Sequence, residues 1–466
     1  MEQLARSIKR VAMVPTVGFL VLCLFVAYWQ VIRAPALRAD PHNSRARARL
    51  KAIEPGELSD RVGNVLLGAR RGTKGFQRTY PEGRCVSHLT GYNSRSGLQR
   101  ALRDALLGVG AYEKPWAELL EGPRRGNDVT LTVDLEAQEL ATRLMRRRRG
   151  AVIALDARDG GILALVSAPG YDPELILGSK WDYELFREDP KAPELNRGLQ
   201  GLYPPGSVLK ILTLAAALDL DRVTPNTELS CPGEYTVEGA RITCPRSHGT
   251  VDVSHALQVS CNIAFAKMAE RVGAADFRRY VKRFHLLDAF KLPLPSKMGK
   301  MGDLTGPDGR VILAETAFGQ GPTLVTPMAI ARLTLTIANG GRAVQPYLVA
   351  CVSGADGRVL ATGQGRDLGA AISPETARTV AGMMVRVVEG GTGRSARIRG
   401  VSVAGKTGSA ENPQGAPHSW FTAFAPADDP RVVVTAIVEN GGTGSESAAP
   451  IVRQVMQQLL SALGAI

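Results

Sequence analysis

The chain has 466 residues, of which 44% are hydrophobic and 22% charged, so its composition is that of a globular protein long enough for two or three domains. Six cysteines in this length exclude a small disulfide-stapled scaffold. The formal net charge is +13, but with 5% aromatic residues and no nucleic-acid motif we expect no nucleic-acid partner. An anionic lipid surface or an anionic polymer of the cell envelope would also attract a chain with this positive charge.

Residues 11–32 form an apolar run without a charged side chain, and about 20 such residues span a bilayer. We therefore predict a membrane anchor over 11–32 that contacts inner-membrane lipids. Arg6, Lys9 and Arg10 precede it and favour a cytoplasmic N-terminal segment, residues 1–10. The alternative is a signal peptide cleaved near Ala34-Pro35-Ala36; the run is longer than the apolar region of most signal peptides, which favours an uncleaved anchor.

Residues 33–126 are more polar and basic, and we predict that they form a small α+β domain, called the pedestal below. Residues 57–66 are typical of a strand, a turn and a second strand. Residues 98–108 carry apolar side chains at helical spacing and end in Gly108.

Residues 127–466 are predicted to form a second, larger domain of the α+β class. Near its start we expect a strand at 128–134, a helix at 135–149 and a hairpin turning at Asp159-Gly160-Gly161. Near its end we expect strands at 401–406, 420–424 and 432–438 and a helix at 451–463, with helices between these two groups. Strands from both ends of the domain would then share one antiparallel sheet flanked by helices.

Ser207 and Lys210 lie three residues apart where an apolar, Ala-rich helix is about to begin. Positions i and i+3 share a helix face, so the Lys210 amine can approach the Ser207 hydroxyl. A serine hydroxyl is a weak nucleophile, and a lysine whose pKa is lowered by burial can take its proton. The pattern is frequent by chance, and an N-cap followed by a surface lysine would look the same.

Two further motifs follow in order along the chain, Ser260-Cys261-Asn262 and Lys406-Thr407-Gly408-Ser409. Singly, each has a structural explanation: Asn262 could cap a helix, and the glycines could mark a bend in an edge strand. Together with Ser207-x-x-Lys210 they match the ordered set used by penicillin-binding proteins and serine β-lactamases. The set predicts a serine acyl-transfer site.

The chain resembles the class B penicillin-binding proteins, the monofunctional peptidoglycan D,D-transpeptidases, over nearly its whole length. Besides the three motifs, the resemblance includes Asp60-Arg61-Val62-Gly63, Gly319-Gln320-Gly321 and Gly391-Thr392-Gly393. It implies a penicillin-binding, serine β-lactamase-like transpeptidase fold with an N-terminal transmembrane helix and a pedestal. It also implies a single-pass protein of the bacterial cytoplasmic membrane whose catalytic domain lies outside the cytoplasm.

The resemblance assigns a role to each motif residue. Ser207 would attack the penultimate D-Ala of a stem peptide ending in D-Ala-D-Ala, release the terminal D-Ala and form an acyl-enzyme that β-lactams would mimic. Lys210 would accept the Ser207 proton, and Ser260 with Lys406 would return a proton to the leaving amine. Backbone N–H groups of Ser207 and Ser409 would form the oxyanion hole. Thr407, Gly408 and Ser409 would bind the substrate carboxylate, Asn262 would bind a peptide amide, and neither a cofactor nor a metal is expected.

The pedestal departs from the family at two positions, Pro55 and Gln99, where an Arg and a Glu are usual. Residues 34–126 are too few for a glycosyltransferase domain. The resemblance therefore implies a separate membrane glycan polymerase, of the shape, elongation, division and sporulation family, as partner. A role in division and a role in elongation both stay open.

Cys231 and Cys244 bracket a predicted hairpin, and a disulfide across its base is one expectation for an oxidising compartment. A metal site that uses Cys244 and His248 is the alternative, but no regular ligand spacing supports it.

Four other functions use the same motifs or the same fold. A serine β-lactamase or a β-lactam-sensing receptor shares the three motifs, but Glu194-Leu195-Asn196 precedes the nucleophile, and no matching deacylating Glu follows Asn262. A D,D-carboxypeptidase and an inactive scaffold that activates the polymerase also stay open.

Overall fold

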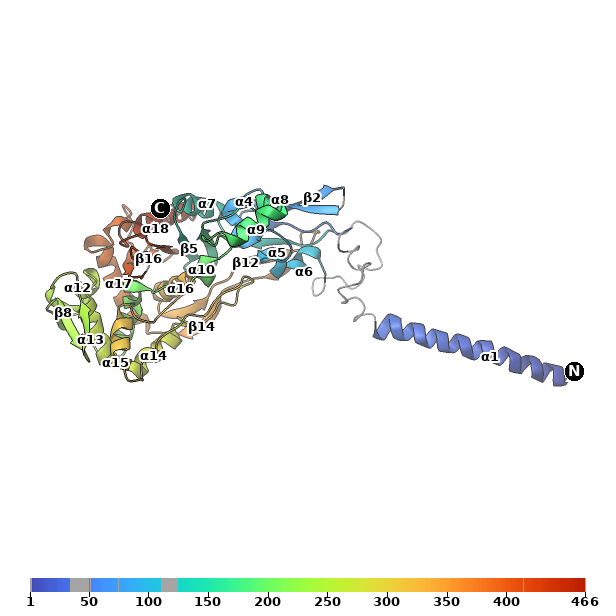
Figure 1. The fold of residues 1–466 in the computed structure, drawn as a ribbon, viewed down its shortest axis with the longest axis horizontal. Helices are drawn as coiled ribbons and strands as arrows, with labels where there is room; N and C mark the ends of the chain where they lie inside the picture. Colours follow the sequence, from blue (N-terminus) through green and yellow to red (C-terminus); the bar gives the residue numbers. More distant parts are fainter. Residues whose placement is uncertain are drawn as a thin grey trace.

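The structure is a computed structural model that describes residues 2–33, 50, 52–73, 75–109, 125–413 and 415–465. The Ala34-Pro35-Ala36 cleavage alternative lies outside these residues, as do parts of the predicted pedestal. At the N-terminus, helix α1 (Glu2–Ala27) continues into a π-helical turn, η1 (Tyr28–Ile32). The span Arg6–Ile32 is long and apolar enough to cross a membrane, and none of it is buried in the protein. It stands apart from the folded body in Figure 1 and confirms the predicted apolar helix.

The pedestal sheet has six strands in the order β13-β12-β4-β1-β2-β3. Their bounds are β1 Leu58–Ser59, β2 Val65–Gly72, β3 Gly75–Thr79, β4 Asp128–Leu131, β12 Val349–Ser353 and β13 Val359–Thr362. Two of these strands, β12 and β13, come from far beyond residue 126. The predicted pedestal of residues 33–126 was therefore incomplete, because β12 pairs with β4 across more than 200 positions of sequence.

The pedestal helices are short: α4 (Gly83–Thr90), α5 (Gly97–Ala101) and α6 (Arg103–Leu107). The predicted helix at 98–108 is interrupted at Leu102 and ends in left-handed Gly108, as a C-terminal glycine favours. Gln99, one of the two departures, is buried and donates hydrogen bonds to the Tyr80 hydroxyl and to the backbone oxygens of Thr90 and Gly91. A glutamate carboxylate at this position could not donate these hydrogen bonds to the two backbone oxygens.

The larger domain is built on a five-stranded antiparallel sheet of order β15-β16-β17-β5-β6. Its strands are β5 Gly150–Asp156, β6 Ile162–Ala168, β15 Ala404–Ala410, β16 His418–Ala425 and β17 Val432–Val438. β17 pairs with β5, which joins the late strands to the early hairpin as the sequence predicted. The predicted α+β class is confirmed.

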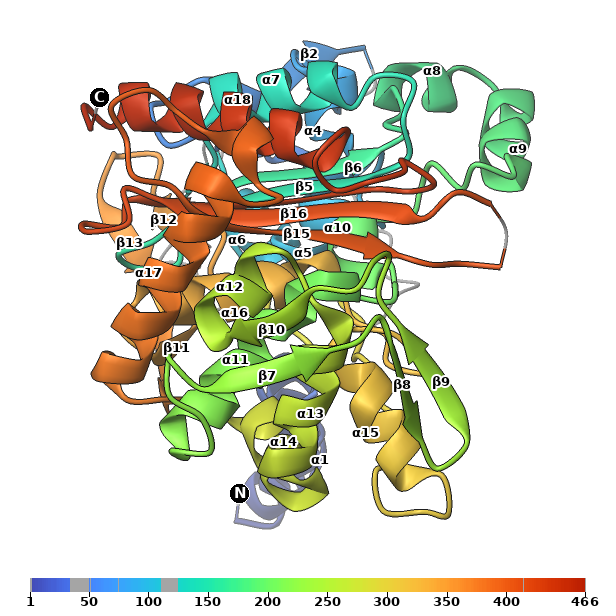
Figure 2. The same ribbon diagram turned by 90° about the vertical axis from the view of Figure 1, so that its left-hand side faces the viewer.

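Helices cover both faces of this sheet, as Figure 2 shows. On one face lie α7 (Leu135–Leu144) and α18 (Ala448–Ala462). α7 is shorter than the predicted 135–149, so Arg146 to Arg149 follow the helix instead of ending it. On the other face lie helices that include α11 (Lys210–Asp219), α16 (Pro327–Ala338) and α17 (Pro374–Gly390), and this face shares its core with the pedestal.

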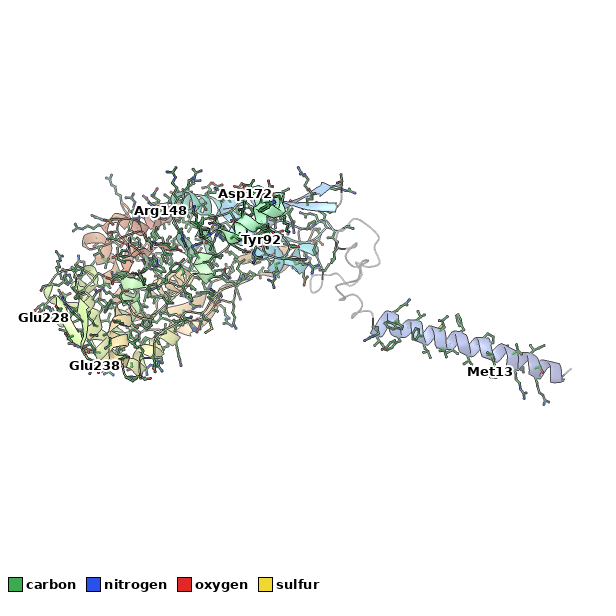
Figure 3. All side chains as sticks on the ribbon, viewed as in Figure 1. Met13, Tyr92, Arg148, Asp172, Glu228 and Glu238 are labelled. Atoms are coloured by element: carbon green, nitrogen blue, oxygen red, sulfur yellow. The ribbon has the colours of Figure 1, made fainter. Side chains whose placement is uncertain are left out.

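Most of the remaining elements lie around this second face, but α8 lies beside α4, and α9 beside α8. The helices are α8 Pro173–Gly178, α9 Lys180–Glu188, α10 Arg197–Gln200, α12 Val253–Gln258, α13 Asn262–Val272, α14 Ala274–Arg283 and α15 Gly309–Ala317. The short strands are β7 Glu228–Cys231, β8 Glu234–Val237, β9 Ala240–Thr243, β10 Gly249–Asp252, β11 Arg342–Gln345 and β14 Arg366–Ala370. In Figure 3, Glu228 and Glu238 mark the end of the body that is remote from Tyr92 and Asp172 of the pedestal side.

Candidate active site

Ser207 lies on a 3-10 turn, η3 (Gly206–Leu209), and Lys210 is the first residue of α11. The turn is held against the edge strand β15. Gly206 has a φ of 58°, and a Cβ there would lie 3.0 Å from the Ser409 carbonyl oxygen. A glycine at this position allows the two backbones to approach, which brings the Ser207 and Ser409 segments side by side.

A second glycine closes the back of the turn. The Gly206 N–H donates to the Gly319 carbonyl over 2.8 Å, and a Cβ on Gly319 would lie 1.9 Å from the Gly206 oxygen. Gly319 also has a φ of 82°, so its place cannot be taken by another residue without moving the nucleophile turn.

Lys210 and Lys406 converge on Ser260. The Lys210 Nζ lies 2.7 Å from the Ser260 carbonyl oxygen, 3.1 Å from its Oγ and 2.7 Å from Asn262 Oδ1. The Lys406 Nζ lies 2.9 Å from the same Ser260 Oγ and 2.9 Å from the Thr407 carbonyl oxygen. Three motifs that are separated by up to 199 positions, from Ser207 to Lys406, therefore meet around one hydroxyl.

Both lysines are fully buried, and burial lowers the pKa of each. The pKa of Lys210 falls to about 7, mainly because its charged form loses hydration, with Cys261 and Cys244 opposing the shift. The pKa of Lys406 is lowered well below its usual range by burial and then by the charge of Lys210. Two ammonium groups on one hydroxyl repel each other, so the arrangement favours a state in which one of the two amines is neutral.

The Lys210 amine has three hydrogen-bond acceptors around it. Its Nζ can donate to the Ser260 carbonyl, to the Ser260 hydroxyl and to Asn262 Oδ1. Lys406 then donates to the Ser260 oxygen. Among the described residues, no hydrogen bond joins Ser207 Oγ to Lys210 Nζ, so the predicted pairing on the helix face is not made in this structure.

The site opens into a cavity of about 600 Å³. The predicted residues that line it are Ser207, Ser260, Asn262, Thr407 and Ser409. The Thr407 hydroxyl shares a 2.7 Å hydrogen bond with the hydroxyl of Thr392, and Gly408 packs its backbone against Val208 and Trp420. Lys210 and Lys406 lie buried behind this surface, as acid–base groups screened from water would.

The carboxylates around the cavity bear on deacylation. Among the described residues that line it, the one carboxylate is Glu411, and its side chain is exposed. Glu194 lines a different cavity and accepts a hydrogen bond from the Tyr92 hydroxyl. Glu194 is therefore not placed to activate water at Ser207.

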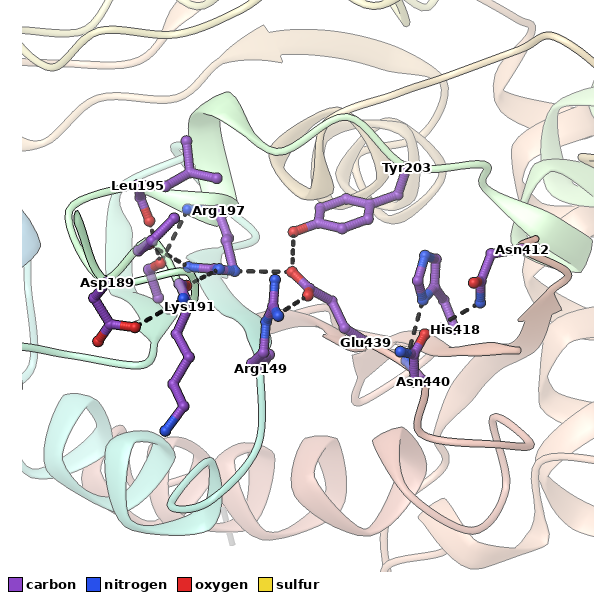
Figure 4. Close-up of polar contacts among 12 residues, drawn as sticks. Arg149, Asp189, Lys191, Leu195, Arg197, Tyr203, Asn412, His418, Glu439 and Asn440 are labelled. Atoms are coloured by element: carbon purple, nitrogen blue, oxygen red, sulfur yellow. Dashed lines mark hydrogen bonds and ion pairs between the residues drawn. The ribbon is translucent and has the colours of Figure 1, made fainter. Parts of the chain in front are cut away.

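Sequence reasoning missed the buried ion pair that supports the nucleophile turn (Figure 4). Arg197, 1% exposed, donates to Glu439 Oε1 over 2.8 Å, and the Tyr203 hydroxyl donates to the same oxygen over 2.7 Å. Arg149 pairs with the second oxygen at 2.9 Å. Burial would raise the pKa of Glu439, but the Tyr203 and Arg197 hydrogen bonds bring it below its usual value. No pattern in the sequence joins residues 197, 203 and 439.

The cysteines differ from the sequence expectation. Cys231 and Cys244 flank the β8–β9 hairpin as predicted, but both are free thiols, so the expected disulfide is absent from the structure. The side chains of Cys261 and His248 join them in one cluster, with all four ligand atoms within 4.8 Å of one another. These residues could hold a metal ion. From the sequence, only Cys244 and His248 were candidates for such a site.

Comparisons with known proteins agree over most of the chain. Residues 150–457 match the family described as the penicillin-binding protein transpeptidase domain. The chain is 34% identical to the peptidoglycan D,D-transpeptidase PbpA of Mycolicibacterium smegmatis, with 97% of this chain and 99% of that protein covered. It is 29% identical to MrdA, a peptidoglycan D,D-transpeptidase of Acinetobacter baumannii, over 82% of this chain and 66% of that protein.

Solved structures show the same likeness. The penicillin G acyl-enzyme complex of penicillin-binding protein A from M. tuberculosis has a TM-score of 0.81 at 30% identity and covers 88% of this chain and 100% of that one. PBP2 of Pseudomonas aeruginosa in complex with WCK 5153 has a TM-score of 0.76 at 29% identity and covers 88% of this chain and 95% of that one. The chain therefore belongs to the penicillin-binding protein transpeptidase family, and within it to class B.

Proposed function

We propose that the chain is a peptidoglycan D,D-transpeptidase in which Ser207 is the acylated nucleophile. The observation that carries the proposal is the convergence of Lys210 and Lys406 on the Ser260 hydroxyl beside the Ser207 turn. The similarity to a peptidoglycan D,D-transpeptidase and to a penicillin-binding protein solved as its penicillin G acyl-enzyme supports the substrate class. This class is a stem peptide that ends in D-Ala-D-Ala.

In the first step the Ser207 oxygen attacks the carbonyl carbon of the penultimate D-Ala. Its proton passes to the neutral Lys210 amine, and Ser260, which is linked to Lys406, returns a proton to the departing D-Ala amine. The backbone N–H groups of Ser207 and Ser409 stabilise the tetrahedral oxyanion, an effect of about 3 to 4 kcal/mol per donor in other acyl transferases.

In the second step an amine of a neighbouring stem attacks the Ser207 ester, the acyl C–O bond to Ser207 breaks, and the proton that the amine loses passes through Lys210 to the Ser207 oxygen, which completes the crosslink. In the first step, Thr407, Gly408 and Ser409, together with the Lys406 charge, bind the carboxylate of the terminal D-Ala. A bound carboxylate favours the charged form of Lys406 and, through like-charge repulsion, the neutral form of Lys210. Asn262 binds a peptide amide in addition to its contact with Lys210.

The experiment is an exchange assay with the purified full chain. A synthetic stem peptide ending in D-Ala-D-Ala is offered together with a biotin-labelled D-lysine as acceptor amine, and products are quantified by mass spectrometry. A transpeptidase gives the exchanged peptide as the main product, and Ser207→Ala gives neither product. Hydrolysed peptide without exchange would instead make the chain a D,D-carboxypeptidase, and absence of both with intact penicillin labelling would favour a sensor or scaffold.

We further propose that the anchor places the catalytic domain outside the cytoplasm, because Arg6, Lys9 and Arg10 precede the span. Glycan polymerisation is then supplied by a separate membrane polymerase that binds the anchor and the pedestal. A reporter fused to the N-terminus that is active only in the cytoplasm tests the orientation. Co-purification of a polymerase with the full chain, lost when the pedestal surface is altered, tests the partner.

A further inference from the structure

A cluster of three cysteines and one histidine lies beside the active site. Cys231 Sγ lies 3.4 Å from His248 Nδ1, and Cys244 Sγ lies 3.8 Å from Cys261 Sγ. We propose that Cys231, Cys244, His248 and Cys261 bind one Zn²⁺ ion. Zn–S bonds of about 2.3 Å in a tetrahedron place two sulfurs about 3.8 Å apart and a sulfur and an imidazole nitrogen about 3.5 Å apart. The separations of 3.4 Å and 3.8 Å are close to these values, and all four ligand atoms lie within 4.8 Å of one another, so small shifts of the side chains would complete a tetrahedral site.

The four ligands are brought together by the fold. Cys231 ends β7, which pairs with β10, and its carbonyl accepts hydrogen bonds from the His248 N–H and the Ser247 hydroxyl. The Cys244 N–H donates to the Gly233 carbonyl, which closes the β8–β9 hairpin against Cys231. Backbone contacts thus fix three of the ligands before any ion binds, and such preorganisation lowers the cost of binding.

The fourth ligand comes from the catalytic motif. Cys261 is the N-cap of α13, and its buried Sγ accepts a hydrogen bond from the Ala264 N–H. Helix α13 contacts both β7 and β9, so one ion would join the hairpin region to the start of this helix. Figure 2 shows β7 to β10 grouped with α12 and α13 below the sheet.

The ligand types select zinc over a disulfide. Three thiolates and a neutral imidazole form one of the standard ligand sets of structural zinc sites. A disulfide would pair two of the sulfurs and leave the third as a thiol beside an imidazole. It would not explain why the His248 side chain lies in the cluster. A disulfide also needs its two sulfurs at about 2.05 Å, well inside the 3.8 Å that separates Cys244 from Cys261.

The position of Cys261 gives the ion a consequence for catalysis, and this step rests on the proposed function. Ser260 has a φ of 59°, a conformation that non-glycine residues rarely adopt, and it must be held there to meet both lysines. Asn262 Nδ2 donates to the carbonyl of Thr243, the neighbour of Cys244. An ion on Cys244 and Cys261 would fix both flanking residues, so the four ligands act as positioning residues for the Ser260–Asn262 motif.

The first test is the metal content of the full chain, purified in detergent with a tag that contains no histidine and measured by inductively coupled plasma mass spectrometry. We expect one zinc per chain, and at least about tenfold less in Cys231→Ser and Cys244→Ser. Cys85→Ser and Cys351→Ser remove half-buried thiols outside the cluster and keep the full content. Absence of zinc after incubation with equimolar Zn²⁺, equal content in all four variants, or a disulfide within the cluster would each overturn the proposal.

A second measurement does not depend on any ligand variant. The chelator-stripped wild type is loaded with Co²⁺, and the intense visible bands of a tetrahedral cobalt–thiolate centre are expected and are displaced by Zn²⁺. Weak octahedral bands would exclude the four-ligand site.

The positioning role has its own readout. Penicillin acylation by the stripped wild type should fall at least tenfold and recover with one equivalent of Zn²⁺, and an unchanged rate would overturn this role. Ser207→Ala separates the two proposals, because it should bind one zinc although it cannot be acylated. If wild type binds zinc and is never acylated, the proposed function fails while the metal site stands.

Discussion

Lys210 and Lys406 both contact one hydroxyl, with their amine nitrogens 3.1 Å and 2.9 Å from Ser260 Oγ. Neither lysine is reached by solvent, and no carboxylate among the described residues bonds to either amine. This relationship explains how a lysine can act as a base near neutral pH, because burial and a neighbouring cation both disfavour its charged form.

Replacing the nucleophile tests the central assignment. Ser207→Ala should abolish covalent labelling by a fluorescent penicillin, because no other hydroxyl stands at the 3-10 turn beside Lys210. Labelling is measured by gel fluorescence and the attachment site by peptide mass spectrometry. Ser461→Ala, an exposed serine of α18, is the control and should label like wild type. Undiminished labelling of Ser207→Ala would show that another residue is acylated.

The rate of penicillin acylation should rise with pH through the pKa of Lys210, which is about 7. Only the neutral amine can accept the Ser207 proton, so the second-order rate constant should increase about tenfold from pH 6 to pH 8 and then level off. Stopped-flow acylation at a series of pH values checks this. A flat or falling profile over that interval would exclude Lys210 as the titrating base.

The same pKa makes a separate prediction for stability. The pKa of Lys210 is lower in the folded chain than in the unfolded chain, where it is about 10.4. Between these values the unfolded state binds more protons, so this group's contribution to the free energy of unfolding rises with pH from about 7 to about 10.4. Thermal unfolding of wild type and Lys210→Met over this range checks the prediction. The unfolding temperature of wild type should rise with pH relative to that of Lys210→Met, which lacks the titrating amine.

Gly319 should tolerate no side chain. Gly319→Ala would place a Cβ 1.9 Å from the Gly206 oxygen, so the nucleophile turn must move and penicillin labelling should fall more than tenfold. Gly239→Ala is the matched control, because Gly239 has a similar φ of 86° but a Cβ there would meet nothing within 4 Å. It should cost about 1 kcal/mol of stability and keep its labelling. Equal labelling loss in both variants would mean that backbone strain, not the contact with Gly206, is responsible.

The Glu439 ion pair should matter for stability. Glu439→Gln leaves the Arg197 guanidinium buried without its charged partner, which should lower the free energy of unfolding by about 3 kcal/mol. Glu139→Gln removes an exposed partner of Arg143 and should change it by less than about 0.5 kcal/mol. Thermal unfolding of both variants checks the difference. Equal changes in the free energy of unfolding would show that the Glu439–Arg197 pair stabilises the fold no more than an exposed pair does.

The penicillin adduct should persist far longer than in a β-lactamase. Glu411, the carboxylate at the cavity, is exposed and therefore poorly suited to activate a water molecule at the Ser207 ester. Intact-protein mass spectrometry after removal of free penicillin measures the lifetime. Rapid turnover of nitrocefin would contradict the prediction, and loss of that turnover in Glu411→Gln would identify the base.

Most of the domain plan could be predicted because it depends on local patterns. Apolar runs and a hairpin turn predicted β5, β6, β16 and β17, a strongly apolar, Ala-rich run predicted α11, and helical spacing predicted α18. The candidate site residues were predicted for a different reason. Acyl transfer needs particular side chains, and three short motifs in a fixed order name them without any knowledge of the fold.

The pedestal boundary and the cysteine cluster could not be predicted in this way. β12 joins the pedestal sheet through a pairing with β4 that no local pattern records. The ligands Cys231, Cys244, His248 and Cys261 are spaced by 13, 4 and 13 positions, which is not a regular metal-binding pattern. Their convergence depends on the β7–β10 pairing, the β8–β9 hairpin and the N-terminus of α13 together.

The sequence by itself predicted the apolar N-terminal span, the fold class and the candidate acyl-transfer groups, because these predictions follow from composition, periodicity and the chemistry of single residues. Only the tertiary structure decided that Lys210 and Lys406 share one hydroxyl, that Glu439 holds Arg197 and Tyr203, and that three sulfurs and an imidazole meet beside Ser260. Contacts of this kind join residues far apart in the chain, and their distances are set by the packing of whole elements.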